Sequence, residues 1–351
     1  MPTKYNTLEG LRFISSVMIV LTHYVPYTLA DQTTLNWTSN FSYAVDLFFV
    51  ISGIVIAHVY GKDWNSRRDY GAFLKNRIAR IYPLHLATLL FYVVIGYLVV
   101  SGFLNAANAD KYNFADLIPN LLLVHAWGFA QGFSFNYVSW SVSAEFFVYL
   151  LFPVILWLIA RGSGFALGLL GALFVSAWFA APVIAGRPLP LLTWDYSMIR
   201  AVPAFSLGVW LQMRCPAKSL GRAAPWLFHG LLAAAAVALL THQGPLVCLF
   251  LVYGVATTGF LCDRTNRPTV ASWGPLRERG ELTYSIYMLH PLVATVLFSV
   301  LAPRLLGGVT WPVVIAGLAA TYVAAVISLR YFEMPMRQAI KHGFVRRPQP
   351  A

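Results

Sequence analysis

GLRFISSVMIVLTHY, residues 10–24, is the stretch that decides the fold class. It is apolar enough to enter a lipid bilayer, and runs such as LLFYVVIGYLVV (89–100) and LLAAAAVALL (231–240) repeat this character along the chain. These runs do not alternate between apolar and polar residues, as the strands of a membrane β-barrel would. They predict an all-α, polytopic membrane protein that lies in a lipid bilayer.

The composition agrees with this class. Of the 351 residues, 58% are hydrophobic and 11% are charged, and the mean hydropathy is +0.65. Soluble domains carry about 25% charged residues. The net charge of +12 is explained by the Lys and Arg that collect in cytoplasmic loops of membrane proteins. Because the common nucleic-acid-binding motifs are absent from the sequence, we expect no nucleic-acid partner.

About ten apolar segments are long enough to cross a hydrocarbon core of roughly 30 Å. The segment 118–128 is apolar but too short to do so. The three cysteines form no CxxC pair and no ligand spacing with His, so we expect free thiols and no metal site. The ten expected spans are 10–27, 41–60, 82–101, 142–160, 164–184, 198–213, 226–241, 245–262, 284–302 and 311–331.

The basic residues are distributed unevenly around these spans. With the N-terminus in the cytoplasm, 21 of the 25 fall in inner segments, and Lys111, Arg187, Arg200 and Arg304 fall outside. This asymmetry predicts that the N- and C-termini are both cytoplasmic.

The sequence predicts a single membrane domain that includes the first span. A cleavable signal peptide is the other interpretation of the first span, but its removal would discard Arg12 and His23. We therefore expect a transmembrane domain at residues 1–335 and a short basic cytoplasmic tail at 336–351.

Arg12 and His23 are costly residues for a membrane span. They are eleven residues apart, which at about 100° per residue makes three turns plus roughly 20°, so both lie on one helix face. The rise between them is about 16 Å, half the hydrocarbon thickness. An ionisable residue at that depth indicates function, and His is the natural general base near neutral pH. A neutral His hydrogen-bonded within the bundle is the alternative.

Two carboxylates are candidate partners of His23. Asp46 lies near the outer end of the second span, where it either orients His23 or faces water as a solvated cap. Glu145 lies near the outer start of the fourth span, where it either hydrogen-bonds His23 or an acceptor hydroxyl, or is an interfacial charge favoured by the helix dipole. Gly53, within the second span, is expected to permit close helix packing.

Further charged residues lie at the inner ends of the third and tenth spans. Arg77 and Arg80 are three apart and share a helix face. They either anchor the loop at the membrane or bind an anionic donor, since Arg suits phosphate. Arg330, Glu333 and Arg337 have the spacing of an ion-pair set within one helix.

Residues 102–141 form a long outer segment rich in aromatic and polar residues. Ser141 has no GxSxG motif around it, so a helix N-cap is expected rather than a nucleophile. The aromatic residues either stack on sugar rings or belong to an interfacial belt. They are Trp127, Phe133, Phe135 and Tyr137.

Six sequence blocks together resemble the acyltransferase-three family of integral-membrane O-acyltransferases. Members modify exopolysaccharides, O-antigen, Nod factors, macrolides and related acceptors. The resemblance covers nearly the whole chain and implies ten core helices in the inner membrane of a bacterium. It also implies an acyl-CoA donor, usually acetyl-CoA, that is reached from the cytoplasm. The blocks are LEGLRFISSVMIVLTH, VDLFFVISG, RIARIYPLH, SWSVSAEFFVYLLFP, TYSIYMLHPL and YFEMPMR, in the order of the family.

The resemblance extends to single residues. Arg12 and His23 match the family's Arg-x10-His element, and Arg77 and Arg80 match its Arg-x-x-Arg element. Trp140, Ser141 and Glu145 match its WSLxxE block, with Val142 where Leu is commoner.

Together, the residues and the resemblance suggest a division of roles. Arg12, Arg77 and Arg80 would hold acyl-CoA. His23 would be the catalytic base, oriented by Glu145 or Asp46. Acceptor contacts would come from Trp140, Ser141 and Tyr137.

The predicted function is transfer of an acyl group, with acetyl the first expectation, from cytoplasmic acyl-CoA to a hydroxyl of a glycan. A macrolide or another small glycoside is the alternative acceptor. A transporter or flippase of a lipid-linked or exported glycan is the alternative class, because buried polar residues also mark transport paths. The chain ends soon after the last span, so we expect a stand-alone membrane core, and the sequence leaves the oligomeric state open.

Overall fold

A computed structural model describes residues 5–61, 64, 67–104, 109–216 and 220–342. These residues form helices and connecting loops, with no strand among them. Each of the ten expected spans coincides with helical structure. The main helices are α1 (Asn6–Tyr24), α3 (Ala44–Tyr60), α4 (Arg67–Val100), α6 (Trp140–Ala160), α7 (Ser163–Ala185), α8 (Met198–Arg214), α9 (Ala224–Leu240), α10 (Pro245–Arg264), α12 (Thr283–Val293) and α14 (Trp311–Ser328).

Shorter elements connect or extend these helices. Two π-helical segments, η11 (Ala294–Leu301) and η12 (Leu329–Glu333), continue α12 and α14. The expected short segment at 118–128 overlaps α5 (Leu117–Leu121). The other short helices are α2 (Gln32–Asn40), α11 (Gly274–Arg277), α13 (Ala302–Leu305) and α15 (Met334–His342).

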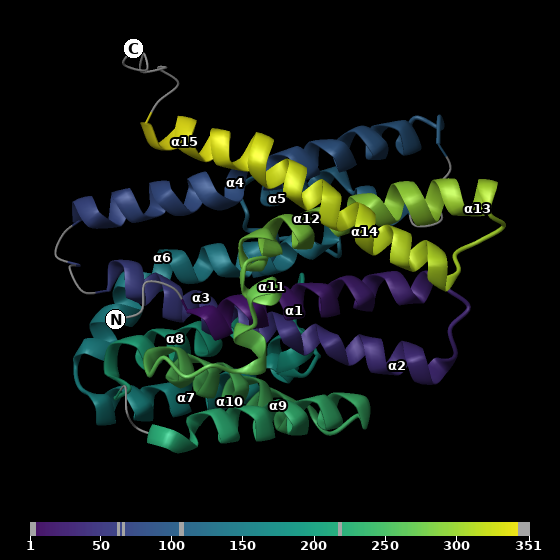
Figure 1. Ribbon diagram of the computed structural model, residues 1–351. Helices are drawn as coiled ribbons and strands as arrows, with labels where there is room; N and C mark the ends of the chain where they lie inside the picture. The colour runs from purple at the N-terminus through teal and green to yellow at the C-terminus, as the bar shows by residue number, and fades with distance from the viewer. Residues whose placement is uncertain (1–4, 62–63, 65–66, 105–108, 217–219, 343–351) are drawn as a thin grey trace, which may run out of the picture.

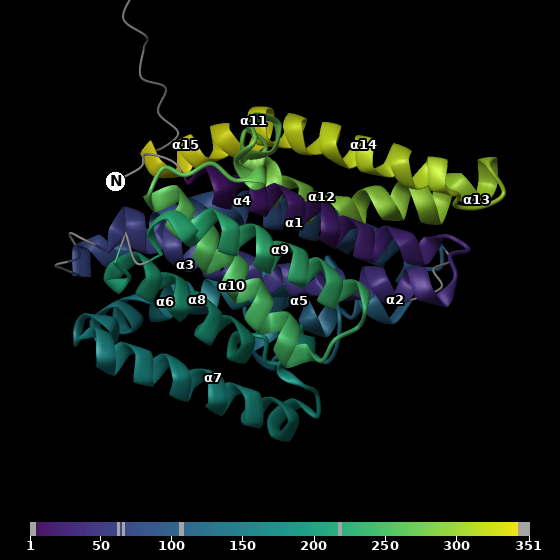
Figure 2. The same cartoon turned by 60° about the horizontal axis from the view of Figure 1, so that its bottom comes forward.

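The helices run side by side as one bundle, and α1 begins toward the same side of it on which α15 ends (Figure 1). Within the described residues, nine helical segments are long and apolar enough to cross a membrane. The expected span at α8 has 17 residues and is not one of these nine. The helix α7 lies at the periphery, apart from the central layers (Figure 2). The all-α, polytopic prediction is therefore confirmed.

The helix α4 differs from its predicted extent. A loop was expected at 61–81, but α4 begins at Arg67, and both Arg77 and Arg80 lie within it. Its 34 residues span about 51 Å, well beyond the hydrocarbon thickness. Pro83 lies inside this helix.

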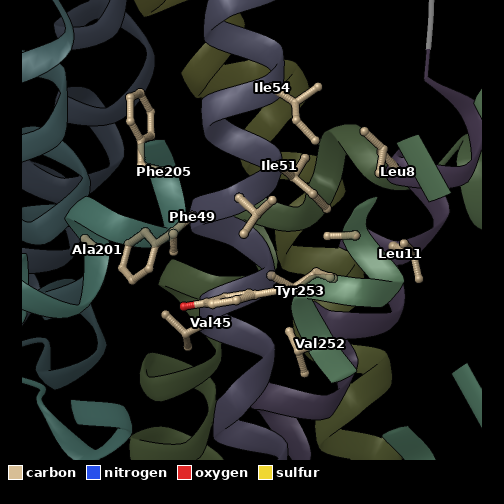
Figure 3. Close-up of a cluster of buried hydrophobic side chains, with 14 of the residues drawn as sticks. Leu8, Leu11, Val45, Phe49, Ile51, Ile54, Ala201, Phe205, Val252 and Tyr253 are labelled. Carbon is tan, nitrogen blue, oxygen red and sulfur yellow. The ribbon is translucent and has the colours of Figure 1, made fainter. Parts of the chain in front are cut away.

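The centre of the bundle is the packing of α3 against α8. A Cβ on Gly53 would lie 2.1 Å from the Phe205 carbonyl oxygen, and one on Gly208 would lie 2.1 Å from the Val50 oxygen. The two backbones therefore touch, which confirms the close packing expected at Gly53. Around this contact, side chains from α1, α3, α8 and α10 form the apolar core (Figure 3).

Candidate functional site

A cavity of about 150 Å³ lies among α1, α3, α4, α6 and α12. The three arginines that the sequence singled out, Arg12, Arg77 and Arg80, all line it. They come from two helices that are far apart in sequence. The cavity also receives Ser141 and Glu145 from α6.

The arginines differ in how they are held. Arg77 is stacked near the rings of Tyr60 and Tyr149, at 5.5 and 6.0 Å from their centroids, and its buried Nε has no hydrogen-bond partner. Among the described residues it forms no ion pair. Arg12 pairs with Glu9 on its own helix at 3.2 Å. These contacts leave a cationic cavity wall that is suited to an anion.

Arg80 is paired across the bundle. Its Nη1 lies 3.6 Å from the buried carboxylate of Glu333, which also accepts hydrogen bonds from Ser285 and Ser328. The expectation that Glu333 pairs with Arg330 and Arg337 on its own helix is therefore wrong. The π-helical turn η12, which contains Glu333, gives this stretch a different side-chain spacing from that of an α-helix.

Glu145 is the carboxylate of the cavity. Ser52 and the Tyr149 hydroxyl both donate to its Oε1, each at 2.6 Å. In the part of the chain that the structure describes, no hydrogen bond or ion pair joins Glu145 to His23. The structure thus gives Glu145 no bond to His23 and places it in the cavity lining, so the hydrogen bond to an acceptor hydroxyl stays a prediction.

Asp46 has a different partner from the one predicted. Arg200 on α8 donates its Nε to Asp46 Oδ1 at 2.9 Å and its Nη2 to Oδ2 at 2.6 Å. Both side chains are buried, at 1% and 0% exposure. A bidentate pair of this kind occupies both carboxylate oxygens. The structure therefore gives Asp46 neither of its expected positions, beside His23 or in outer-leaflet water.

The expected acceptor residues lie in three different environments. Trp140 covers the buried guanidinium of Arg200, at 5.4 Å from its ring centroid, and does not line the cavity. Ser141 is the second residue of α6 and donates to the Tyr287 hydroxyl at 2.7 Å, so the N-cap expectation is wrong. Tyr137 lies edge-on to His23, with ring centroids 5.1 Å apart.

His23 is paired with a second histidine. Its Nδ1 lies 3.0 Å from Nε2 of His290 on α12, and the two rings are stacked at 5.0 Å. The other nitrogen of His290, Nδ1, lies 3.3 Å from the Ile286 carbonyl oxygen. A carbonyl only accepts, so Nδ1 of His290 carries the proton and its Nε2 is the acceptor. His23 Nδ1 then donates, which leaves the lone pair of the imidazole on His23 Nε2, the nitrogen that can act as a base.

The helix α12 connects the cavity to this histidine pair. Tyr284, Tyr287 and His290 follow one another at intervals of three residues, and the two tyrosines line the cavity. The Tyr287 and His290 rings are 6.0 Å apart. His23 itself is not part of the cavity lining, although Arg12 on the same helix is. The histidine pair therefore lies just behind the wall that Tyr287 forms.

Two residues that sequence reasoning left without a role are central to this geometry. His290 was visible in the TYSIYMLHPL block, and a second ionisable residue inside a span was the available signal. Arg200 was counted as an outer basic residue, although its position within the span 198–213 was the same kind of signal.

Comparisons with known proteins place the chain among acyltransferases. Acyltransferase MdmB of Streptomyces mycarofaciens is 31% identical over 205 residues, 53% of this chain and 50% of its own. Peptidoglycan O-acetyltransferase OatA of Listeria monocytogenes is 24% identical over 97% of this chain and 56% of its own. Protein 2 in the picA locus of Rhizobium radiobacter is 39% identical over 90 residues, 25% of this chain and 44% of its own.

The chain thus spans about half the length of the curated relatives it matches. No solved structure matches it. The acyltransferase-3 family model, described as an acyltransferase domain, matches residues 5–330. The chain therefore belongs to the acyltransferase-3 family.

Proposed function

We propose that the protein is a membrane-bound O-acyltransferase that moves an acyl group, acetyl in the first instance, from acyl-CoA to a hydroxyl of a glycan. The observation that carries the proposal is the convergence of Arg12, Arg77 and Arg80 on one cavity, whose wall residue Tyr287 lies 6.0 Å from His290 of the His23–His290 pair. Family membership supports acyl transfer, and a relative named as a peptidoglycan O-acetyltransferase supports both the acetyl group and a glycan acceptor.

The donor would bind with its phosphates at the arginines. Arg77 forms no ion pair among the described residues, and Arg12 and Arg80, although paired with Glu9 and Glu333, add two more guanidinium groups that a polyanion can contact. At about 150 Å³ the cavity is smaller than the roughly 300–1,000 Å³ of drug-sized ligand sites. It suits the slim acyl-pantetheine end, while the nucleotide would remain at the mouth. We place this mouth in the cytoplasm of a bacterium, with both termini, because most basic residues lie in the segments on that side.

The chemistry would take place at His23. Its Nε2 accepts the proton of the acceptor hydroxyl as that oxygen attacks the thioester carbonyl. The C–S bond breaks, the new ester carries the acyl group, and the CoA thiolate leaves and takes up a proton. His290 holds His23 in the tautomer that this step needs, as the third member of a nucleophile–base–orienter set does.

The test is acyl transfer by the purified protein, with labelled acetyl-CoA and neutral oligosaccharides from a cell-envelope extract. We expect His23→Ala to lower kcat by about 10²–10⁴, the usual contribution of a general base. Arg77→Ala should weaken CoA binding, measured as a thermal shift, whereas the exposed Arg222→Ala serves as a matched control with wild-type affinity.

Three outcomes would refute the proposal. The first is full transfer by His23→Ala, which would remove the base. The second is an unchanged CoA affinity in Arg77→Ala, which would make that arginine a membrane anchor. The third is a wild-type protein that moves a glycan across a vesicle membrane and shows no saturable stabilisation by CoA.

A further inference from the structure

The outer segment between α4 and α6 contains a second hollow, of about 300 Å³. Six side chains that line it are Asp110, Lys111, Asn113, Asp116, Gln131 and Phe133. Its two walls are joined where the Phe135 backbone N–H donates to the Lys111 carbonyl at 2.8 Å. The hollow is therefore part of the folded structure of this segment.

The hollow lies at the end of the bundle opposite the arginines. Its residues follow the end of α4 at Val100, which is twenty residues, or about 30 Å, beyond Arg80 on the same helix. Lys111 Nζ lies 5.7 Å from the ring centroid of Tyr92, in the later turns of α4. The cavity and the hollow thus approach the bundle from opposite ends.

Asp116 is the feature of the hollow that calls for a ligand. Its side chain is 3% exposed, and among the described residues its carboxylate has no hydrogen-bond donor and no ion-pair partner. Lys111, the basic residue of the hollow, lies over the rings of Tyr92 and Tyr112 instead. Because Asp116 lines the hollow, its carboxylate can accept hydrogen bonds from a group bound there.

Two ring contacts connect the rim of the hollow to His23. Phe133, 42% exposed, lies 6.4 Å from Tyr137, and Tyr137 lies 5.1 Å from His23. The chain between them is held in a demanding conformation, since Phe135 has a φ of +53° while its side chain is fully buried. Such strain in a non-glycine residue is typical of sites whose geometry is fixed for function.

We infer that this hollow is the acceptor site and that it binds a neutral, hydroxyl-rich group such as a sugar ring; the inference rests on the proposed function. Asp116 accepts hydrogen bonds from the hydroxyls, and Phe133 packs against the apolar face of the ring. Two carboxylates against one Lys disfavour an anionic acceptor. The donor and the acceptor then reach His23 from opposite ends of the bundle.

The first test blocks the hollow at its rim. Gln131 is exposed there, and Gln131→Cys is treated with a bulky maleimide. The control is the exposed Gln32→Cys at the start of α2, and treated wild-type protein accounts for the native thiols. We expect labelled Gln131→Cys to lose at least tenfold in transfer to the envelope oligosaccharides, while its thermal shift with CoA is unchanged. Transfer unaffected by complete labelling would overturn the inference.

The second test removes the charge of Asp116. Asp116→Asn should raise the KM for the oligosaccharides by about tenfold or more, because a charged acceptor with two oxygens becomes a neutral amide with one acceptor oxygen and an NH2 donor. Its KM for acetyl-CoA should match that of the exposed control Asp31→Asn and of wild type. An unchanged oligosaccharide KM would overturn the inference, as would a stabilisation by Ca²⁺ or Mg²⁺ alone that Asp116→Asn abolishes. Failure of the proposed function itself is distinct, because wild-type protein would then show no transfer and no CoA shift.

Discussion

The buried pair of Asp46 and Arg200 provides the sharpest test of what holds this bundle together. The guanidinium is 1% exposed and makes two bonds to Asp46, at 2.9 and 2.6 Å. Its other acceptors are the carbonyls of Leu192 and Ser42, at 3.3 and 3.2 Å. Asp46→Leu removes both carboxylate bonds and leaves the charge buried. We expect this to lower the free energy of unfolding by about 3–5 kcal/mol, the usual cost of an orphaned buried charge.

The double variant separates the cost of an orphaned buried charge from the contribution of the ion pair to the free energy of unfolding. Asp46→Leu with Arg200→Met replaces both charges by apolar side chains, so no buried charge remains. Its free energy of unfolding should return close to that of wild type, because a buried ion pair and a well-packed apolar substitute are often equivalent. The assay is denaturant unfolding of all variants in one detergent, with the exposed Glu278→Leu as a control for surface substitution.

The same variants distinguish a structural Asp46 from a catalytic one. If the pair is structural, the folded fraction of the double variant transfers acyl groups at close to the wild-type rate. Asp46→Leu that unfolds like wild type yet has lost transfer would refute the reasoning, since Asp46 would then act on a substrate rather than on Arg200.

Three further predictions follow from single contacts. Gly208→Leu should lower the unfolding midpoint in the same assay, because its Cβ would meet the Val50 oxygen at 2.1 Å and force α3 from α8; wild-type stability would contradict this packing. His290→Phe removes the acceptor for His23 Nδ1 and should lower kcat, within the 10²–10⁴-fold range of general-base catalysis, with the KM for acetyl-CoA unchanged. His290→Gln should recover part of the loss through its carbonyl, and no recovery would argue against a tautomer-fixing role. Asp263→Ala removes the carboxylate that accepts from two backbone N–H groups at the start of α1. It should lower the free energy of unfolding by about 1 kcal/mol, as loss of a helix cap does. An unchanged unfolding curve would show that water takes the place of the carboxylate.

The sequence predicted the helices well because hydropathy is a local property. A run of about 20 apolar residues identifies a membrane helix whatever surrounds it. The start of α4 was missed for the same reason, since the turns from Arg67 to Arg80 extend the helix with charged residues and give no apolar signal. The α8 span was found although its 17 residues contain Arg200.

Side-chain partners were harder to predict than helices. Helical spacing correctly put Arg77 and Arg80 on one face, and the structure brings both to the cavity with Arg12. Spacing does not say which helix lies opposite, so Asp46 was matched with His23 although its partner, Arg200, lies 154 residues away. Glu333 shows the same limit, because its cation, Arg80, comes from a helix far away in sequence.

The partner of His23 is a histidine, although the sequence predicts a carboxylate, and this difference has a physical reason. In water, a carboxylate orients an imidazole well, but inside a membrane bundle it must be compensated by several donors or a cation. Asp46 has Arg200, and Glu145 has Ser52 and Tyr149, so each is already compensated where it stands. The neutral ring of His290 fixes the His23 tautomer without introducing a charge, and its own proton is held by a backbone carbonyl of the same helix. A base at this depth therefore needs only one more polar side chain, supplied by the helix that also forms the cavity wall.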